Sequence, residues 1–157
     1  MYPNQKPRQL RKSALVLLLL LAACSDPFRT SVNSDAAQVL AGSDPSVSRS
    51  DPVDIVHAEI QGDDLLLQLR FGGGCAEHDF ALVHSGEFME SHPVQTTLTL
   101  MHDAHGDVCR ALLEREITFD LSPVKQAYRR AYSEHGVIIV HLAAPGSTPT
   151  PSVRYVF

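Results

Sequence analysis

The stretch DIVHAEIQGDDLLLQLRF, residues 54–71, contains two runs in which apolar and polar side chains alternate. The apolar positions of these runs are Val56, Ala58 and Ile60, then Leu65, Leu67, Leu69 and Phe71. Alternation with a period of two is typical of strands that bury one face. The polar residues 61–64 between the runs include a glycine and are typical of a tight turn. Residues 54–71 therefore predict a β-hairpin of two half-buried strands.

Further short apolar runs follow the hairpin, separated by turn residues. We expect strands over residues 80–84, 94–102, 113–121, 137–143 and 153–157. One helix interrupts them: Ser122 is placed to cap it, Pro123 suits its first turn and Gly136 ends it. This order predicts an antiparallel β-sandwich of about seven short strands with one short helix. The alternative is an α+β fold in which the helix packs on an antiparallel sheet.

The N-terminus has the organisation of an export signal. Four basic residues, Lys6, Arg8, Arg11 and Lys12, precede an unbroken apolar run over residues 14–23. This run is about half as long as the roughly 20 residues that a membrane-spanning helix needs. We therefore expect a cleaved signal peptide over residues 1–23 rather than a transmembrane helix.

The motif Leu21-Ala22-Ala23-Cys24 resembles the lipobox of bacterial lipoproteins. The resemblance implies diacylglycerol on the sulfur of Cys24, cleavage before Cys24, and acylation of its new amine with a chain such as palmitate. Two or three acyl chains give stable anchoring, which a single chain does not. In enterobacterial lipoproteins an aspartate after the lipidated cysteine retains the protein in the inner membrane. Ser25 at that position therefore implies sorting to the outer membrane, if the envelope has two membranes.

The sequence predicts three segments: the signal peptide over 1–23, lipidated Cys24 with a flexible tether over 24–52, and a β-rich globular domain over 53–157. The tether is expected because this stretch is rich in Ser, Asp and Pro and contains three Asp-Pro pairs. Cleavage removes four of the 13 basic residues and none of the 18 acidic ones, so the formal charge falls from −5 to −9. Such an acidic chain is poorly suited to bind nucleic acid or anionic lipid. We expect contact with the membrane through the lipid alone.

Cys75 and Cys109 remain in the predicted domain. An even pair of cysteines in an exported protein typically forms a disulfide. Closing a loop of about 35 residues would stabilise the fold by roughly 3–4 kcal/mol. The alternative is a metal site, since Cys75, His78 and Cys109 with His102 or His105 would suit tetrahedral zinc, and Met101 would favour copper(I). The prediction is a disulfide and no resident cofactor, with zinc or copper left open as the alternative.

The pattern Gly73-Gly74-Cys75-x-x-His78 resembles one found in bacterial envelope lipoproteins of unknown function, and that resemblance implies no activity. No family signature of a nucleophilic cysteine surrounds Cys75. The chain also lacks the Gly-x-Ser-x-Gly, His-Glu-x-x-His and phosphate-loop motifs. The stretch Asp103-x-His105-x-Asp107 is too short for a calcium loop, and we expect a simple turn there. The sequence therefore predicts no catalytic residue and no enzyme.

Together these features predict a bacterial envelope lipoprotein, held at a membrane by lipid on Cys24 and facing the periplasm or the cell surface. Its domain is expected to act as a non-enzymatic binding or structural module for an unknown envelope protein or ligand. A metal-binding lipoprotein is the alternative function.

Overall fold

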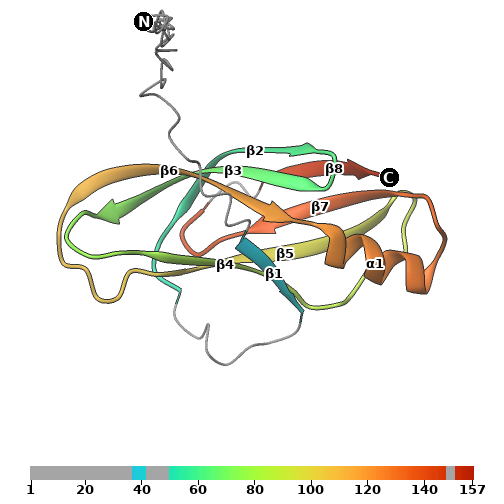
Figure 1. Cartoon of the computed structure of the whole chain (residues 1–157), viewed down its shortest axis with the longest axis horizontal. Coiled ribbons are helices and arrows are strands. Elements are labelled where there is room, and N and C mark those ends of the chain that lie inside the picture. Colours follow the sequence, from blue (N-terminus) through green and yellow to red (C-terminus); the bar gives the residue numbers. More distant parts are fainter. Residues whose placement is uncertain (1–36, 42–49, 148–150) are drawn as a thin grey trace, which may run out of the picture. The chain divides into compact units, whose positions relative to one another are not determined.

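The computed structural model describes residues 37–41, 50–147 and 151–157. Eight strands and one helix lie in these ranges (Figure 1). The strands are β1 (Ala37–Ala41), β2 (Asp54–Gln61), β3 (Asp64–Gly73), β4 (Asp79–His84), β5 (Val94–Asp103), β6 (Ala111–Asp120), β7 (Val137–Ala143) and β8 (Ser152–Val156). The helix is α1 (Ser122–Ala131). Cys24, its lipobox and Ser25 lie outside the described residues, as do the signal peptide and most of the expected tether.

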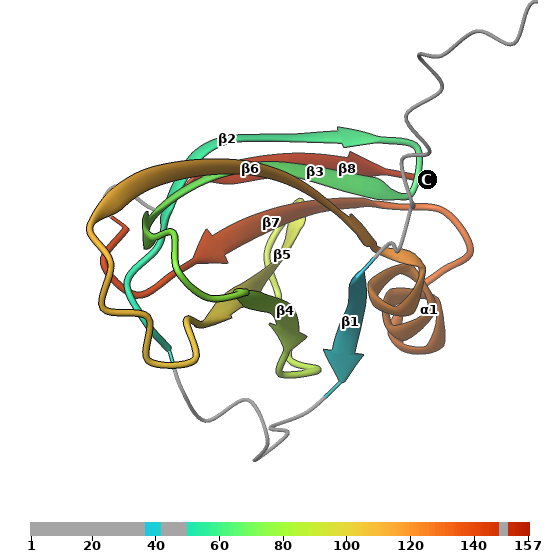
Figure 2. The same cartoon turned by 60° about the vertical axis from the view of Figure 1, so that its left-hand side comes forward.

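The strands form two facing layers, which confirms the predicted β-sandwich with one helix (Figures 1 and 2). One sheet contains β2, β3 and β6, and the other contains β4, β5, β7 and β8. Not every strand pairing is antiparallel, because β7 pairs in parallel with β5, and β1 pairs in parallel with both β4 and β6. The crossover through α1 makes the parallel β5–β7 pairing possible, since parallel neighbours cannot be joined by a tight turn.

The two sheets bury a continuous apolar core between them. Leu65, Leu67 and Leu69 of β3 are fully buried and Phe71 nearly so, as the alternation in the sequence predicts. In β2 the prediction is partly wrong, because Ile55 is buried while Val56 is 44% exposed. The β2–β3 register shifts between Ile55 and His57. This bulge inserts one residue and reverses the facing of the strand before it, which a strict two-residue period cannot anticipate.

Strand β1 lies within the segment that the sequence assigns to a flexible tether. Its residues Ala37 and Gln38 pair with β6, and residues 39–41 pair with β4. Figure 2 shows β1 beside β4 and the end of β6. Residues 37–41 therefore belong to the sheet, and β1 links the two layers along one side.

Helix α1 covers the end of the sandwich where β6 finishes (Figure 1). It buries Val124 and Tyr128, four residues apart on one helical face. The predicted ends of the helix are wrong: Leu121 rather than Ser122 occupies the N-cap, and the helix ends at Ala131 with Tyr132 as its C-cap, before Gly136. The Asp120 carboxylate accepts a hydrogen bond from the Ser122 amide. No helix in the described part of the chain has the length and apolar character that crossing a membrane requires.

Candidate functional site: a disulfide loop around a buried carboxylate and two histidines

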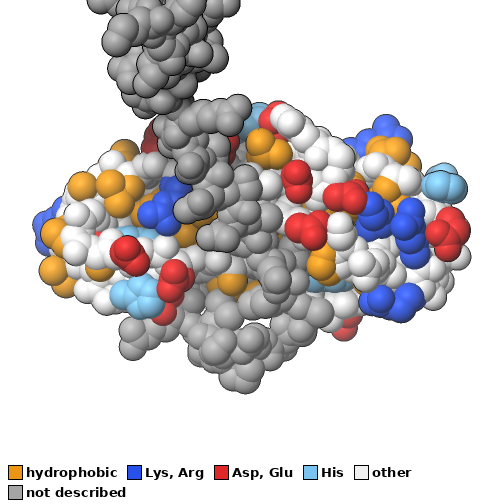
Figure 3. All heavy atoms as spheres, in the orientation of Figure 1, with side chains coloured by type: hydrophobic (Ala, Val, Ile, Leu, Met, Phe, Trp, Pro, Cys, Tyr) orange, Lys and Arg blue, Asp and Glu red, His pale blue; other side chains and the backbone are white. Residues whose placement is uncertain are grey.

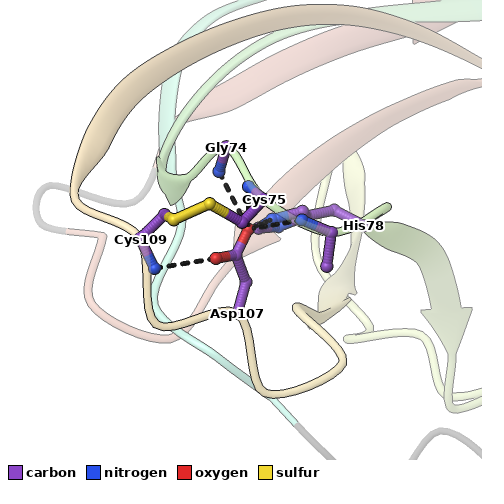
Figure 4. Close-up of a disulfide and its surroundings, with 6 residues drawn as sticks. Gly74, Cys75, His78, Asp107 and Cys109 are labelled. Carbon is purple, nitrogen blue, oxygen red and sulfur yellow. Dashed lines mark hydrogen bonds and ion pairs between the residues drawn. A yellow bond between two sulfur atoms is a disulfide. The ribbon is translucent and has the colours of Figure 1, made fainter.

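Cys75 and Cys109 are joined by a disulfide, with their Cα atoms 5.8 Å apart. Cys75 follows the end of β3, and Cys109 precedes the start of β6. Gly73 and Ala111 are the last paired residues of the antiparallel β3–β6 ladder. The bridge therefore ties together the two chain segments that diverge beyond this ladder (Figure 4).

The carboxylate of Asp107 fills the loop beside the bridge. Its Oδ2 accepts hydrogen bonds from the amides of Gly74, Cys75 and Ala76 at 2.8, 2.8 and 2.9 Å. Its Oδ1 accepts one from the amide of Cys109 at 2.8 Å (Figure 4). Three successive amides pointing at one oxygen form an anion-binding nest. Here the chain's own carboxylate occupies the nest, and the amides of Cys109 and Cys75 are the main reason that the pKa of Asp107 lies far below its usual range.

Gly73 is required by the close approach of His78 and Asp107. A Cβ added there would overlap the imidazole of His78 and lie 3.0 Å from Oδ2 of Asp107. Gly73 also has φ +153°, and Gly74 has φ +117°. This contact gives the glycine run before Cys75 a specific purpose, which is not apparent from the sequence alone.

A chain of polar contacts runs inward from Asp107. Nε2 of His78 lies 3.2 Å from Oδ2 of Asp107, and Nδ1 of His78 lies 2.8 Å from Nε2 of His102. Nδ1 of His102 then lies 3.2 Å from the carbonyl oxygen of Pro52. The groups at both ends of this series of contacts can only accept hydrogen bonds, because the Asp107 carboxylate is ionised and the Pro52 carbonyl has no proton to donate.

The proton count of the two imidazoles follows from this geometry. Three contacts need three ring protons if all are to be hydrogen bonds, whereas two neutral imidazoles carry only two. Burial lowers the pKa of His102, and repulsion from His78 acts in the same direction. When both imidazoles are neutral, only two of the three contacts are therefore hydrogen bonds.

The cluster is enclosed on every side. The side chains of His78 and Asp107 are 1% and 0% exposed, and His102 is 1% exposed. The ring of Phe80 stacks on His102, with centroids 4.6 Å apart. Arg115 donates a hydrogen bond to the carbonyl of His78, and its guanidinium lies 5.6 Å from the centroid of the Phe80 ring. Pockets of about 210 and 360 Å³ open on the described surface, but neither is lined by His78, His102 or Asp107.

The structure brings together only part of the predicted metal set. His78 and His102 meet, but both sulfurs are consumed by the disulfide. His105 points elsewhere: its Nε2 lies 2.7 Å from Oδ2 of Asp79, which is the main reason that its pKa is raised. Within the described residues, Cys75, Asp107 and Cys109 form the one group with metal-ligand spacing, and two of its three donors are the bonded sulfurs. These residues do not fit zinc or copper.

An Asp-His pair can act as a general base when a substrate reaches it. Here the imidazole nitrogens of both histidines face protein atoms, and none of their contacts is a serine, threonine or cysteine side chain. What this arrangement does chemically is hold the loop, because the buried carboxylate and the amides around it satisfy one another's hydrogen bonds.

Sequence reasoning missed Asp107 as the centre of the site. Asp107 was expected to be one of several polar turn residues. Apart from the Cys109 amide, its partners belong to a loop distant in the chain, with Gly74 at a separation of 33 and His78 at 29. The available signal was a glycine pair directly before Cys75 and four residues before His78, combined with an aspartate two residues before a cysteine.

Comparisons with known proteins show similarity in the fold but not in the sequence family. No family model matches the sequence, and no curated protein matches it. Among solved structures, a NigD-like immunity protein from Bacteroides caccae is similar with a TM-score of 0.57 and 18% identity, covering 77% of this chain and 63% of that one. A protein from Parabacteroides distasonis, provisionally named toxin-related, is similar with a TM-score of 0.50 and 20% identity, covering 77% and 60%.

A protein from Bacteroides fragilis, provisionally named a lipoprotein, has a TM-score of 0.43 and 11% identity, covering 76% of this chain and 70% of that one. This chain spans less than two thirds of the length of the NigD-like immunity protein and of the Parabacteroides distasonis protein. At these identities the likeness concerns the fold, and the β-sandwich described above is one that solved Bacteroides and Parabacteroides proteins share.

Proposed function

We propose that this protein is a lipid-anchored module of the bacterial envelope that works by binding or structural support rather than by catalysis. The proposal that the protein does not act by catalysis rests on the enclosure of the Asp107–His78–His102 cluster. This cluster has the groups most suited to acid-base chemistry, yet its side chains are buried and paired with one another.

The anchor rests on the sequence. Residues 14–23 are apolar and end directly at Cys24, in the lipobox arrangement. The disulfide between Cys75 and Cys109 fits an oxidising compartment outside the cytoplasm. The fold is shared with proteins named for immunity and for toxin-relatedness, and neither name describes a reaction.

The anchor is tested by changing Cys24 to Ala in the full chain, expressed in a bacterium that processes lipoproteins. We expect the unchanged protein to take up an alkyne analogue of palmitate and to sediment with washed membranes. The variant should lose the label and leave the membrane fraction. A Cys75→Ser/Cys109→Ser variant is the matched control, because it lacks two cysteines but should still be labelled. Retention of the Cys24→Ala variant in washed membranes would contradict the anchor.

The proposed non-catalytic role is tested by measuring whether solvent can reach His78 and His102. Diethylpyrocarbonate modifies imidazoles that solvent can reach, and mass spectrometry locates the product. We expect His78 and His102 to resist modification in the folded protein, while the exposed His57, His92 and His135 react. Modification of His78 at the rate of His57 would show that small molecules reach the cluster, and catalysis would then be the better proposal.

A further inference from the structure

A pocket of about 360 Å³ lies at the end of the sandwich that carries α1, well separated in the fold from the disulfide loop. Four elements or their flanking residues build it: the start of β5, helix α1, the start of β7, and β8. Tyr128 and Gly136 line its inner part, and His92, His135 and Arg154 line its exposed rim.

The charge of this pocket is opposite to that of the chain. No carboxylate lines it, although the predicted mature chain has a formal charge of −9. Arg154 takes part in none of the ion pairs formed among the described residues. Figure 3 shows Lys and Arg side chains gathered at the end of the domain where α1 lies. Arg154 is therefore a permanent cation whose guanidinium fork is available to a ligand.

The inner part of the pocket offers both a polar donor and an apolar wall. The Tyr128 hydroxyl takes part in no hydrogen bond among the described residues, although the residue is only 7% exposed. Its ring lies so close to Gly136 that any Cβ there would overlap it. Tyr132 packs against Tyr128 with ring centroids 4.9 Å apart and is 41% exposed, so the aromatic surface continues out of the pocket.

We infer that this pocket binds the carboxylate of a small molecule or chain end that also carries an apolar or aromatic group. One permanent positive charge at Arg154 balances one negative charge, and a guanidinium pairs two of its N–H groups with the two oxygens of a carboxylate. The Tyr128 hydroxyl and the imidazoles of His92 and His135 supply further donors. The rings of Tyr128 and Tyr132 and the side chains of Val94 and Val137 would face the apolar group. This site goes beyond the proposed function, which names no ligand.

The test measures protection of the pocket histidines in membranes that contain the full, lipidated chain. N-acetyl-phenylalanine is the carboxylate probe, its amide is the neutral match, and inorganic phosphate is the other anion. We expect N-acetyl-phenylalanine at millimolar concentrations to slow diethylpyrocarbonate modification of His92 and His135 several-fold. Modification of His57, which lies outside the pocket, should not change.

Variants of two arginines identify the residue responsible. Arg154→Ala should abolish the protection, and Arg154→Lys should keep only part of it, because a lysine retains the charge but not the fork. Arg130→Ala, an exposed arginine on α1 outside the pocket, should leave it unchanged. Resistance of His78 to modification verifies that each variant is folded. Equal protection by the amide would replace the proposal by an apolar groove, equal or greater protection by phosphate would replace it by a general anion site, and no protection by any probe would overturn it.

Discussion

Asp107 illustrates how a single side chain can organise a loop that has little apolar surface. Its two oxygens accept hydrogen bonds from four backbone amides, those of Gly74, Cys75, Ala76 and Cys109. Its Oδ2 also contacts Nε2 of His78. These amides belong to both sides of the disulfide, so the carboxylate links the same two segments that the bridge links. Ionisation matters here because a carboxylate oxygen accepts stronger hydrogen bonds than a neutral amide oxygen does.

We therefore expect Asp107→Asn to destabilise the fold markedly. The new NH2 group cannot accept, so either the Cys109 amide or the three amides of residues 74–76 lose their acceptor. The melting temperature, followed by circular dichroism, should fall by roughly 10 °C. Asp103→Asn, in the same turn and half-buried, is the matched control and should change it by less than a few degrees. A melting temperature unchanged by Asp107→Asn would mean that the nest does not need its charge.

His84 gives the pH dependence of stability a definite sign. Burial lowers its pKa from the usual 6.5, and its Nε2 lies 2.9 Å from Oγ1 of Thr96, whose hydroxyl donates to the carbonyl of Glu87. The folded state therefore keeps His84 neutral, whereas the unfolded chain takes up a proton near pH 6.5. Stability from this source is fully present above about pH 6.5 and is lost as the pH falls below it.

His84→Gln tests this contribution, since glutamine can still donate to Thr96 but does not titrate. We expect its free energy of unfolding in urea to fall less than that of the unchanged protein between pH 7 and pH 5.5. His57→Gln, at an exposed position, should leave the pH dependence unaltered. Identical slopes for the His84 variant and the unchanged protein would show that His84 is not the group responsible.

At the scale of elements, the disulfide holds the ends of β3 and β6 together where their ladder stops. The sequence separation of 34 residues between the cysteines corresponds to about 3–4 kcal/mol in the chain-entropy model. We expect Cys75→Ser/Cys109→Ser to lower the free energy of unfolding by about this amount, and diethylpyrocarbonate to modify His78 and His102 in the variant. Cys24→Ser, which leaves the bridge intact, is the control. Equal stability with and without the bridge would place the constraint in the Asp107 hydrogen bonds instead.

The elements also show what a sequence can and cannot predict. The strand β3 was predictable because four alternating apolar residues face one core, and periodicity reports that directly. The parallel pairing of β5 with β7 was not, because strand partners depend on crossovers between distant segments. In the site, the disulfide was predictable because an even pair of cysteines in an exported protein usually forms one, whereas the sequence left open whether His102 or His105 would accompany His78. The role of Asp107 was not predictable, since its acceptor geometry exists only once two distant loops come together.

At the scale of the whole molecule, the boundary of the folded domain lies earlier than the composition of the chain suggests. Strand β1 is only five residues long and stands in a Ser-, Asp- and Pro-rich stretch, so its local signal is weak. Its backbone nevertheless pairs with β6 through residues 37–38 and with β4 through residues 39–41. Without β1, the facing edges of β4 and β6 would lose their partner, and unpaired strand edges favour association between molecules.

Two truncated chains without lipid test this boundary, one beginning at Asn33 and one beginning at Ser50. Because net backbone hydrogen bonds contribute about 0.5–1.5 kcal/mol each, loss of β1 should cost roughly 2–4 kcal/mol and lower the melting temperature by 10 °C or more. The shorter chain should also associate as its concentration rises, as measured by analytical ultracentrifugation. Val39→Pro in the longer chain removes one amide from β1 without shortening it, and its melting temperature should fall between those of the two chains. If the two chains melt within about 3 °C of each other and both stay monomeric, β1 contributes nothing to the folded domain and the boundary belongs near residue 50.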